Sequence, residues 1–312
     1  MTKCRYWRTS MQKVPGRTGK PLTVFKEKTV FVSGGAEGIG LSIARAMGAR
    51  GMNVVLADID LEQLERARQA LNSAGVPVLA VPLDVAKLDQ WQQAAASAVE
   101  RFGSLHMLVN NAGVGGTAGG VGNTDEAEWR WVIDVNLLGV AFGTQTMVPL
   151  MQAHGEGGWI VNVASMAGFG PLPGAAPYTA TKAAVVAMSE GWRVELAADN
   201  ISVSVLCPGF VNTRIYDSGR SKPGHDGSAS SGTKDSDRRS LIESVVTSGM
   251  DVDIVGERVA EALLANETYI FTHPNYRQSV KARWRAVDAA FDAAEQSPLL
   301  TDDVVPDLPF AG

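Results

Sequence analysis

Cysteine, histidine and long apolar runs are scarce in this chain of 312 residues. The only cysteines are Cys4 and Cys207, so no disulfide framework is predicted, and we expect a reducing compartment, the cytoplasm. The four histidines are scattered without ligand spacing, and we expect no metal site. No apolar run approaches about 18 residues, so we also expect no membrane span.

Acidic residues outnumber basic ones over the whole chain, but not at its start. The formal net charge is −5, which gives no basic field for nucleic acid, and none is expected as a partner. Residues 1–24 contain several lysines and arginines but no acid and no apolar signal core, and we interpret them as a disordered basic leader. Residues 294–312 are interpreted as an acidic tail, which leaves 25–293 for the folded domain.

Strand-like and helix-like segments alternate through this central region. Short apolar runs such as "TVFVSG", "NVVLAD" and "GWIVNVAS" are each followed by segments with helical spacing, the longest of them over 126–151. Such alternation is typical of βαβ units, and strands that are apolar throughout are typical of a sheet covered on both faces. We therefore predict one α/β domain of the Rossmann type, with a doubly wound parallel sheet of about seven strands.

A polar segment, 216–239, interrupts this pattern. It reads "YDSGRSKPGHDGSASSGTKDSDRR" and offers little to bury, so we expect it to be mobile. Its position after the sixth strand suits a substrate lid, but a tolerated surface loop is an equal alternative on composition alone.

The stretch "SGGAEGIG", from Ser33 to Gly40, lies where the first strand turns into the first helix. Gly34 permits a tight turn, Gly38 would let backbone N–H groups approach a pyrophosphate, and Gly40 allows close packing of the helix. The helix N-terminus adds about half a positive charge facing the phosphates. The segment therefore predicts a dinucleotide site.

An acid, Asp58, ends the second strand at the spacing expected for the carboxylate that binds an adenosine ribose. Such a carboxylate would repel a 2′-phosphate, and Ile59 follows instead of an arginine. We therefore predict NAD, with NADP as the less favoured cofactor. The alternative role is a helix cap, for which Asp60 is better placed.

The stretch "YTATK" places a phenol and an ammonium, Tyr178 and Lys182, on one face of a predicted helix. An ammonium favours the phenolate, although lowering a pKa from about 10 to about 7 requires about 4 kcal/mol. Ser165 ends the fifth strand at the edge where ligands bind in such sheets, and its hydroxyl suits a substrate oxygen. The three residues predict acid–base chemistry.

Together these motifs resemble the short-chain dehydrogenase/reductase family. The resemblance covers about Lys26 to Thr213, and Ser33 replaces the threonine usual before the first glycine. The matching motifs are "SGGAEGIG", Asp58, "LDV" at Asp84, "NNAG", "VNLLG" with Asn136, Ser165, "YTATK" and "PGFVNT".

The resemblance implies a role for each catalytic residue. Tyr178 would be the general acid/base, Lys182 would lower its pKa and hold the nicotinamide ribose, and Ser165 would orient the substrate oxygen. Asn136 would hold a water that links Lys182 to solvent. A homotetramer or homodimer packed through the Asn136 and Tyr178 helices is also implied.

The cofactor contacts follow from the same resemblance. Asp84 and Val85 would contact adenine, Asn111 would shape the cofactor wall, and Thr213 would bind near the carboxamide. The full predicted set is Ser33, Gly34, Gly38, Ile39, Gly40, Asp58, Asp84, Val85, Asn111, Tyr178, Lys182, Val211 and Thr213.

A looser resemblance concerns the substrate. "TRIYDSGRSKPG" and "YIFTHPNYRQSVKARW" are similar to bacterial Cα-dehydrogenases of lignin-derived aryl ethers, which implies a bulky aryl or alicyclic secondary alcohol or its ketone. An apolar pocket or ordinary packing explains Phe169, Phe210, Val211 and Tyr216 equally well. A catalytically silent NAD-binding sensor or scaffold, an NADPH-dependent ketone reductase and a nucleotide-sugar epimerase or dehydratase remain as alternatives.

Overall fold

A computed structural model describes residues 24–300 except 117–118, 171, 223 and 225–232, with only the backbone described over 233–239. Most of the predicted leader and tail, at 1–23 and 301–312, lies outside the described residues. The described residues divide into two compact units, one up to residue 272 and one from His273 onward. The division at His273 comes before the predicted domain end at 293.

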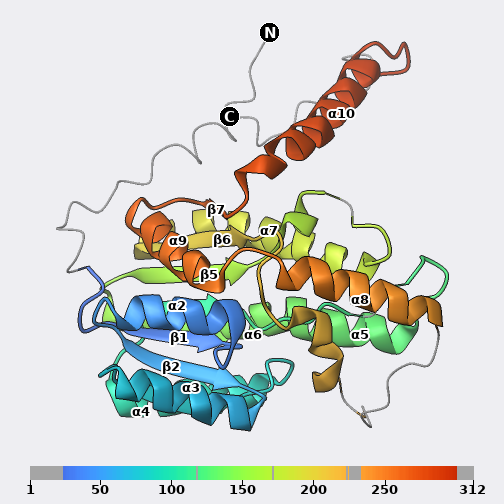
Figure 1. The fold of residues 1–312 in the computed structure, drawn as a ribbon. Helices are drawn as coiled ribbons and strands as arrows, with labels where there is room; N and C mark the ends of the chain where they lie inside the picture. Colours follow the sequence, from blue (N-terminus) through green and yellow to red (C-terminus); the bar gives the residue numbers. More distant parts are fainter. Residues whose placement is uncertain (1–23, 117–118, 171, 223, 225–232, 301–312) are drawn as a thin grey trace. The chain divides into compact units, whose positions relative to one another are not determined.

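The first unit is built on one parallel sheet of seven strands in the order β3-β2-β1-β4-β5-β6-β7 (Figure 1). Chain order reverses between β1 and β4, which is the switch point where doubly wound sheets bind ligands. The predicted Rossmann-type fold is therefore confirmed. The strands are β1 Thr29–Ser33, β2 Asn53–Asp58, β3 Val78–Pro82, β4 Met107–Asn110, β5 Gly158–Val163, β6 Ile201–Cys207 and β7 Tyr269–Phe271.

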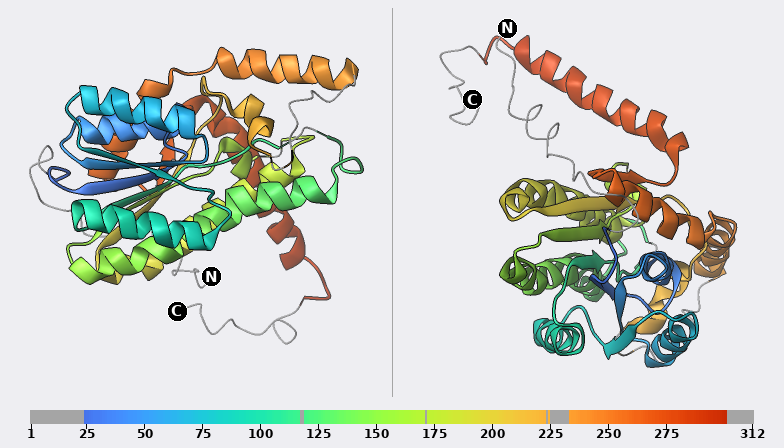
Figure 2. Two further views of the ribbon diagram at one scale, coloured as in Figure 1. Left: turned by 90° about the horizontal axis from the view of Figure 1, so that it is seen from below. Right: turned by 90° about the vertical axis from the view of Figure 1, so that its left-hand side faces the viewer.

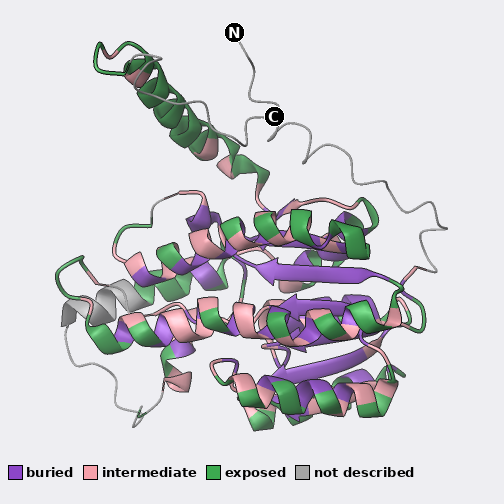
Figure 3. Ribbon diagram, turned by 180° about the vertical axis from the view of Figure 1, so that it is seen from behind, coloured by how far each residue is buried: buried purple, intermediate pink, exposed green. Residues whose placement is uncertain are grey.

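Helices cover both faces of this sheet (Figure 2, right). On β1, Val30 and Val32 pack toward α2, α3 and α9, whereas Phe31 between them packs toward α4, α6 and α7, because side chains alternate along a strand. The central strands are buried throughout (Figure 3). The helices are α2 Gly38–Gly48, α3 Leu61–Ser73, α4 Leu88–Phe102, α6 Gly139–His154, α7 Ala176–Glu195 and α9 Val252–Leu264.

The helix predicted over 126–151 is continuous but not uniform. It consists of α5 Glu126–Ile133, a π-helical turn η1 Asp134–Leu138, and α6. The run Glu126–His154 has the length and mean hydropathy, 1.2, of a membrane span, a criterion that we expected the chain not to meet. Of its most apolar window, 39% is buried inside the protein, and buried core helices pass the same criterion.

The polar segment 216–239 contains more helix than its composition predicts. A 3₁₀ helix, η4 Ile215–Ser221, opens it, and α8 Thr233–Thr247 begins within it. The remaining residues, 223 and 225–232, lie outside the described residues. Arg214, just before η4, and Arg220 within it form ion pairs with Glu37.

The described part of the second unit is a short 3₁₀ helix, η5 Pro274–Tyr276, followed by α10 Arg277–Glu295. No residue of α10 is buried.

Candidate active site

Ser165, Tyr178 and Lys182 come together at the carboxyl edge of β5. Ser165 follows this strand and caps the 3₁₀ helix η2 Met166–Gly168, where its Oγ accepts a hydrogen bond of 3.1 Å from the N–H of Ala167. Tyr178 and Lys182 lie one turn apart in α7, and Ser165 lies close enough to the hydroxyl of Tyr178 to act on its pKa. The structure thus brings these three residues together at one edge of the sheet.

Lys182 is buried, with 3% of its surface exposed, and its ammonium faces the sheet. Its Nζ donates a 2.8 Å hydrogen bond to the carbonyl of Val163 and lies 5.6 Å from the ring centroid of Tyr178. Burial lowers the pKa of Lys182 to about 8, because desolvation disfavours the charged form. Lys182 can therefore give up a proton near neutral pH.

The acid–base state of Tyr178 differs from the expectation. Burial raises the pKa of Tyr178 above its usual value, and the hydrogen bond with Ser165 acts in the lowering direction. The protein's own groups thus do not produce the lowered pKa expected from Lys182. An additional positive charge beside the phenol would be needed to favour the phenolate.

Asn136 lies in the π turn and is fully buried. Its Oδ1 accepts from the N–H of Val114 at 2.8 Å, and its Nδ2 donates to the carbonyl of the same residue at 2.9 Å. A Cβ added to Gly113 would lie 3.3 Å from Oδ1 of Asn136 and 3.4 Å from Nζ of Lys182. Asn136 therefore fixes the loop after β4 against the Lys182 side chain. Because both side-chain groups bind Val114, a water held by Asn136 would bind its backbone carbonyl.

The glycine turn is closed by its own backbone. Gly34 and Gly38 have φ angles of +61° and +57°, and a Cβ on Gly40 would lie 2.2 Å from the carbonyl oxygen of Gly34. Glu37, the N-cap residue of α2, makes no capping hydrogen bond, so the N–H groups of the first turn are not used by a side-chain cap. Ile39 is the second residue of this helix.

Ser33 and Asn111 join this turn to β4. The Oγ of Ser33 donates to the carbonyl of Val109 and accepts from the N–H of Asn111 at 3.1 Å. The Nδ2 of Asn111 donates to the carbonyls of Ser33 and Gly34 at 3.0 and 2.8 Å. Asn111 thereby holds the glycine turn against the end of β4.

Asp58 points back into the glycine turn. Its Oδ2 accepts from the N–H of Ala36 at 3.0 Å, and its Oδ1 accepts from the N–H of Asp60 at 3.0 Å. Burial raises the pKa of Asp58, while these backbone hydrogen bonds act to lower it. The separate capping role belongs to Asp60, whose carboxylate accepts from Gln63.

The remaining predicted cofactor residues lie on loops at the same edge. The carboxylate of Asp84, just after β3, accepts from the N–H of Ala86, and Val85 is buried beside Gly139. A Cβ on Gly38 would lie 3.3 Å from Cγ2 of Thr213, so the loop after β6 meets the glycine turn. Val211 is buried and bridges Met250, which anchors this loop.

Comparisons with known proteins agree with this geometry. The sequence model described as "short chain dehydrogenase" matches residues 28–224. The chain belongs to the short-chain dehydrogenase family. It is 30% identical to the C alpha-dehydrogenase of Sphingobium sp. over 88% of this chain and 90% of the relative. It is 32% identical to a CLA biosynthesis dehydrogenase/reductase of Lactiplantibacillus plantarum, over 84% and 94%.

A solved structure is similar over the same region. A short-chain dehydrogenase/reductase from Burkholderia phymatum in complex with NAD shares 33% identity and a TM-score of 0.81, covering 85% of this chain and 96% of its own. This protein is accordingly an NAD(P)-dependent oxidoreductase, and its family includes dehydrogenases of small-molecule alcohols. The residues present fit a dinucleotide, because the first turn of α2 has no side-chain cap and its N–H groups can face a phosphate, while a Cβ on Gly34 or Gly40 would clash with neighbouring backbone.

A charged cluster beside the glycine turn was missed by the sequence analysis. The carboxylate of Glu37 forms ion pairs with Arg214, at 3.4 Å, and with Arg220 of η4. Lys222 pairs at 2.7 Å with Glu128, which is only 3% exposed, and the N–H of Gly115 donates to Oγ of Ser218. These partners are far apart in sequence, so no local pattern could have indicated them.

The residues expected to line a pocket do not all gather. Phe169 packs edge-on against Tyr269 and Phe271 of β7, with ring centroids 6.0 and 5.5 Å away. Phe210 is 42% exposed and follows the end of β6. The substrate pocket therefore stays a prediction.

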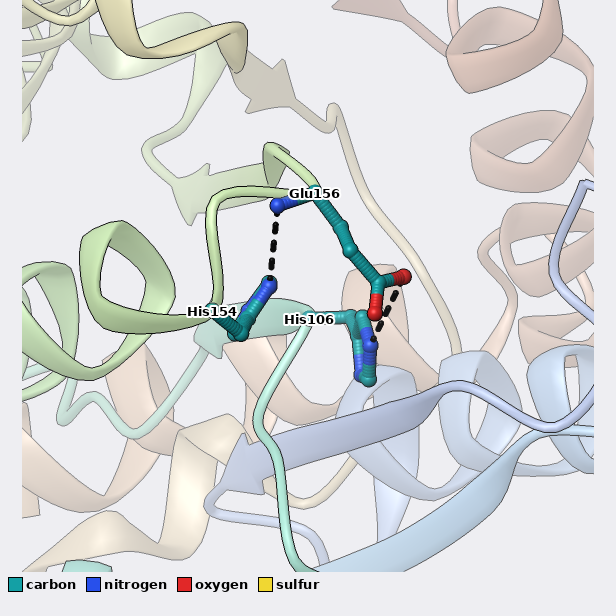
Figure 4. A group of neighbouring side chains, drawn as sticks. All are labelled: His106, His154 and Glu156. Atoms are coloured by element: carbon teal, nitrogen blue, oxygen red, sulfur yellow. Dashed lines mark hydrogen bonds and ion pairs between the residues drawn. The ribbon is translucent and has the colours of Figure 1, made fainter.

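Two histidines that are distant in sequence meet at the opposite end of the sheet. His106, His154 and Glu156 form a cluster with the geometry of a metal site (Figure 4). However, Nδ1 of His106 accepts from Thr29, and the ring nitrogens of His154 bind Glu156 N–H and the carbonyl of Leu105. In the neutral tautomers that these contacts imply, the lone pair of each imidazole accepts a backbone N–H, and Nε2 of His106 faces the carboxylate of Glu156 at 3.6 Å.

Proposed function

We propose that this dehydrogenase oxidises a bulky aryl or alicyclic secondary alcohol with NAD as hydride acceptor. The observation that carries the proposal is the convergence of three side chains: Ser165 acts on the hydroxyl of Tyr178 to lower its pKa, and Nζ of Lys182 lies 5.6 Å from the ring centroid of Tyr178. Such a pair of hydroxyls at the carboxyl edge of a sheet suits an alcohol oxygen that must be oriented and then deprotonated.

In the proposed reaction, the hydroxyl of Ser165 orients the substrate oxygen and the phenolate of Tyr178 accepts its proton. A bound nicotinamide would supply the acceptor for the hydride. Because burial keeps the phenol neutral, its deprotonation has to be coupled to a nearby positive charge, which both Lys182 and an oxidised nicotinamide ring provide. In the reverse direction Tyr178 would protonate the oxygen of a ketone.

Lys182 is the proposed next group in the proton path. Its pKa of about 8 matches a group that exchanges protons near neutral pH. The adjacent Asn136 would relay the proton to solvent through a water at its backbone, since the π turn interrupts regular helical hydrogen bonding there.

NAD is proposed over NADP because of the carboxylate of Asp58. Asp58 ends β2, and its Oδ2 accepts from the N–H of Ala36 in the glycine turn. This carboxylate would repel a 2′-phosphate, and Ile59 beside it carries no compensating charge. Arg214 and Arg220 are already paired with Glu37, which reduces their availability to a phosphate.

The bulky substrate is supported by the similarity to a C alpha-dehydrogenase over 88% of the chain, which includes the variable segment after Thr213. The segment 214–222 is proposed to act as a lid. Its charges pair with Glu37 of the glycine turn and with Glu128 of α5, so the same segment contacts both the glycine turn and a helix that packs against the catalytic helix α7.

A homo-oligomer is proposed through the helices that carry Asn136 and Tyr178. The helix Glu126–His154 is apolar on average, yet less than half of its most apolar window is buried within the chain. A second copy of the chain would remove the remaining apolar surface from water and so lower the free energy of the assembly.

The experiment that tests the function is a screen of aryl, alicyclic and steroidal secondary alcohols with NAD, in which NADH absorbance is measured. We expect turnover with at least one bulky alcohol and a loss of at least about 100-fold in Tyr178→Phe. NADH binding, measured by fluorescence, should persist in this variant, and Tyr276→Phe is the matched control.

Turnover by Tyr178→Phe at the rate of the unmodified enzyme would refute the assigned role. NAD binding without turnover of any alcohol or ketone would favour the silent sensor, and activity confined to ketones with NADPH would favour the reductase.

A further inference from the structure

The C-terminal helix α10 carries an apolar stripe that its own unit leaves exposed. Trp284, Val287 and Phe291 are 60%, 40% and 67% exposed, although large aromatic side chains usually find cover. The three line one groove, together with Lys281 and Asp288. These side chains therefore share one face of the helix.

The spacing of this stripe is that of a helix–helix seam. Val280, Trp284, Val287 and Phe291 follow one another at intervals of four, three and four residues. This is the a/d repeat by which two helices pack side by side. The cover that the spacing fits is thus a second helix.

Charge is divided between the two halves of α10. Its first half contains only basic charged residues and its second half only acidic ones, with no acid in the first turn and no base in the last. This order opposes the helix dipole, which favours acids at the N-terminus and bases at the C-terminus. The charges are Arg277, Lys281, Arg283 and Arg285, then Asp288, Asp292 and Glu295.

We propose that α10 pairs in antiparallel orientation with α10 of a second copy of this chain. A two-fold axis between Arg285 and Ala286 would place Trp284 opposite Val287 of the other copy. The basic half of each helix would then face the acidic half of the other, which offsets the unfavourable order of charges. The contact is self-complementary, as a two-fold interface requires.

The pairing makes Lys281 and Asp288 partners across the axis. Val280 and Val287 are the d residues of the repeat, and Lys281 and Asp288 each follow one of them. In antiparallel helix pairs, positions that follow a d residue face each other beside the seam. The axis makes this ion pair occur twice. Parallel pairing would instead set like charges together, and an anionic membrane surface would repel the acidic half.

Charge reversal in the full-length protein tests the proposal by sedimentation equilibrium. Lys281→Glu and Asp288→Lys should each weaken self-association at least about tenfold, and the double variant should restore it to within about threefold. Ala289→Lys is the matched control, because it adds the same side chain one residue further on, away from the seam, and should change little. Thermal unfolding of each variant verifies that the fold is retained.

Disulfide trapping tests the orientation in a Cys4→Ser background. A mixture of Val280→Cys and Phe291→Cys chains should form a crosslinked dimer under mild oxidation, whereas Val280→Cys alone should not. Crosslinking of Val280→Cys alone, equal association of all charge variants, or a monomer throughout would overturn the proposal. So would binding to anionic vesicles that persists in both single variants.

Discussion

At the scale of single residues, burial sets the acid–base behaviour of Tyr178 and Lys182. It raises the pKa of Tyr178 above its usual value and lowers the pKa of Lys182 to about 8. In both cases desolvation favours the neutral form. Near neutral pH the protein therefore holds a neutral phenol beside an ammonium that is close to its own pKa, and a positive charge that arrives with the cofactor would favour loss of a proton from both.

Asp58 gives the prediction for cofactor choice. Asp58→Ala should lower the preference for NAD over NADP by roughly 10- to 100-fold, because a charged hydrogen-bond acceptor contributes about 1.5–3 kcal/mol. The measurement is kcat/KM with each cofactor.

Asp58→Asn is the matched variant, since it keeps an acceptor for the N–H of Ala36 but removes the charge. It should retain much of the binding of NAD while accepting NADP better. An unchanged NAD to NADP ratio in both variants would contradict the contact with the ribose.

At the scale of elements, the lid segment and the glycine turn are coupled by charge. Glu37 caps α2 without a capping hydrogen bond because its carboxylate is directed to Arg214 and Arg220 instead. Partly exposed ion pairs contribute up to about 1 kcal/mol each. The coupling is therefore strong enough to bias the position of η4 but weak enough to be broken during turnover.

Trypsin measures this coupling, since it cleaves after Arg214 and Arg220; Lys222 precedes a proline and is not cleaved. Glu37→Gln should speed cleavage in this segment roughly two- to fivefold, corresponding to about 0.5–1 kcal/mol. NAD with a substrate should slow it in the unmodified protein. Glu62→Gln, which removes an equally charged partner of Arg66 on α3, is the control. Equal cleavage of Glu37→Gln and Glu62→Gln would argue against the lid.

At the scale of the whole molecule, the histidine cluster at the far end of the sheet links stability to pH. Burial, Lys28 and His154 together lower the pKa of His106 to about 4, while Glu156 acts in the opposite direction. The folded protein thus keeps His106 neutral while the unfolded chain takes up a proton below about pH 6.5. Stability from this group is complete above pH 6.5 and is lost as pH falls toward 4.

His106→Asn tests this linkage. Asparagine keeps an acceptor for the N–H of Thr29 but cannot be protonated. The variant should be less stable at pH 7 because it fills the site less well, and its deficit should shrink by about 1–2 kcal/mol between pH 7 and pH 5. Unfolding midpoints at several pH values measure it. A deficit that is constant with pH would show that His106 is not the group responsible.

The sequence by itself determined the doubly wound parallel sheet and singled out the candidate site residues. Alternating apolar runs and amphipathic helices have few solutions other than a doubly wound sheet, and Gly34, Gly40 and Asp58 are recognisable because a strand-to-helix turn restricts what can stand there. Residues one helical turn apart, such as Tyr178 and Lys182, are also neighbours in any helix.

Only the tertiary structure decided the contacts between distant segments. The ion pairs of Glu37, the π turn around Asn136 and the meeting of His106 with His154 depend on how elements pack, and no local pattern encodes them. The raised pKa of Tyr178 has the same origin, since burial depends on residues from several strands and helices at once. Local periodicity therefore determined where helices and strands form, and long-range packing determined which charged groups lie around the site.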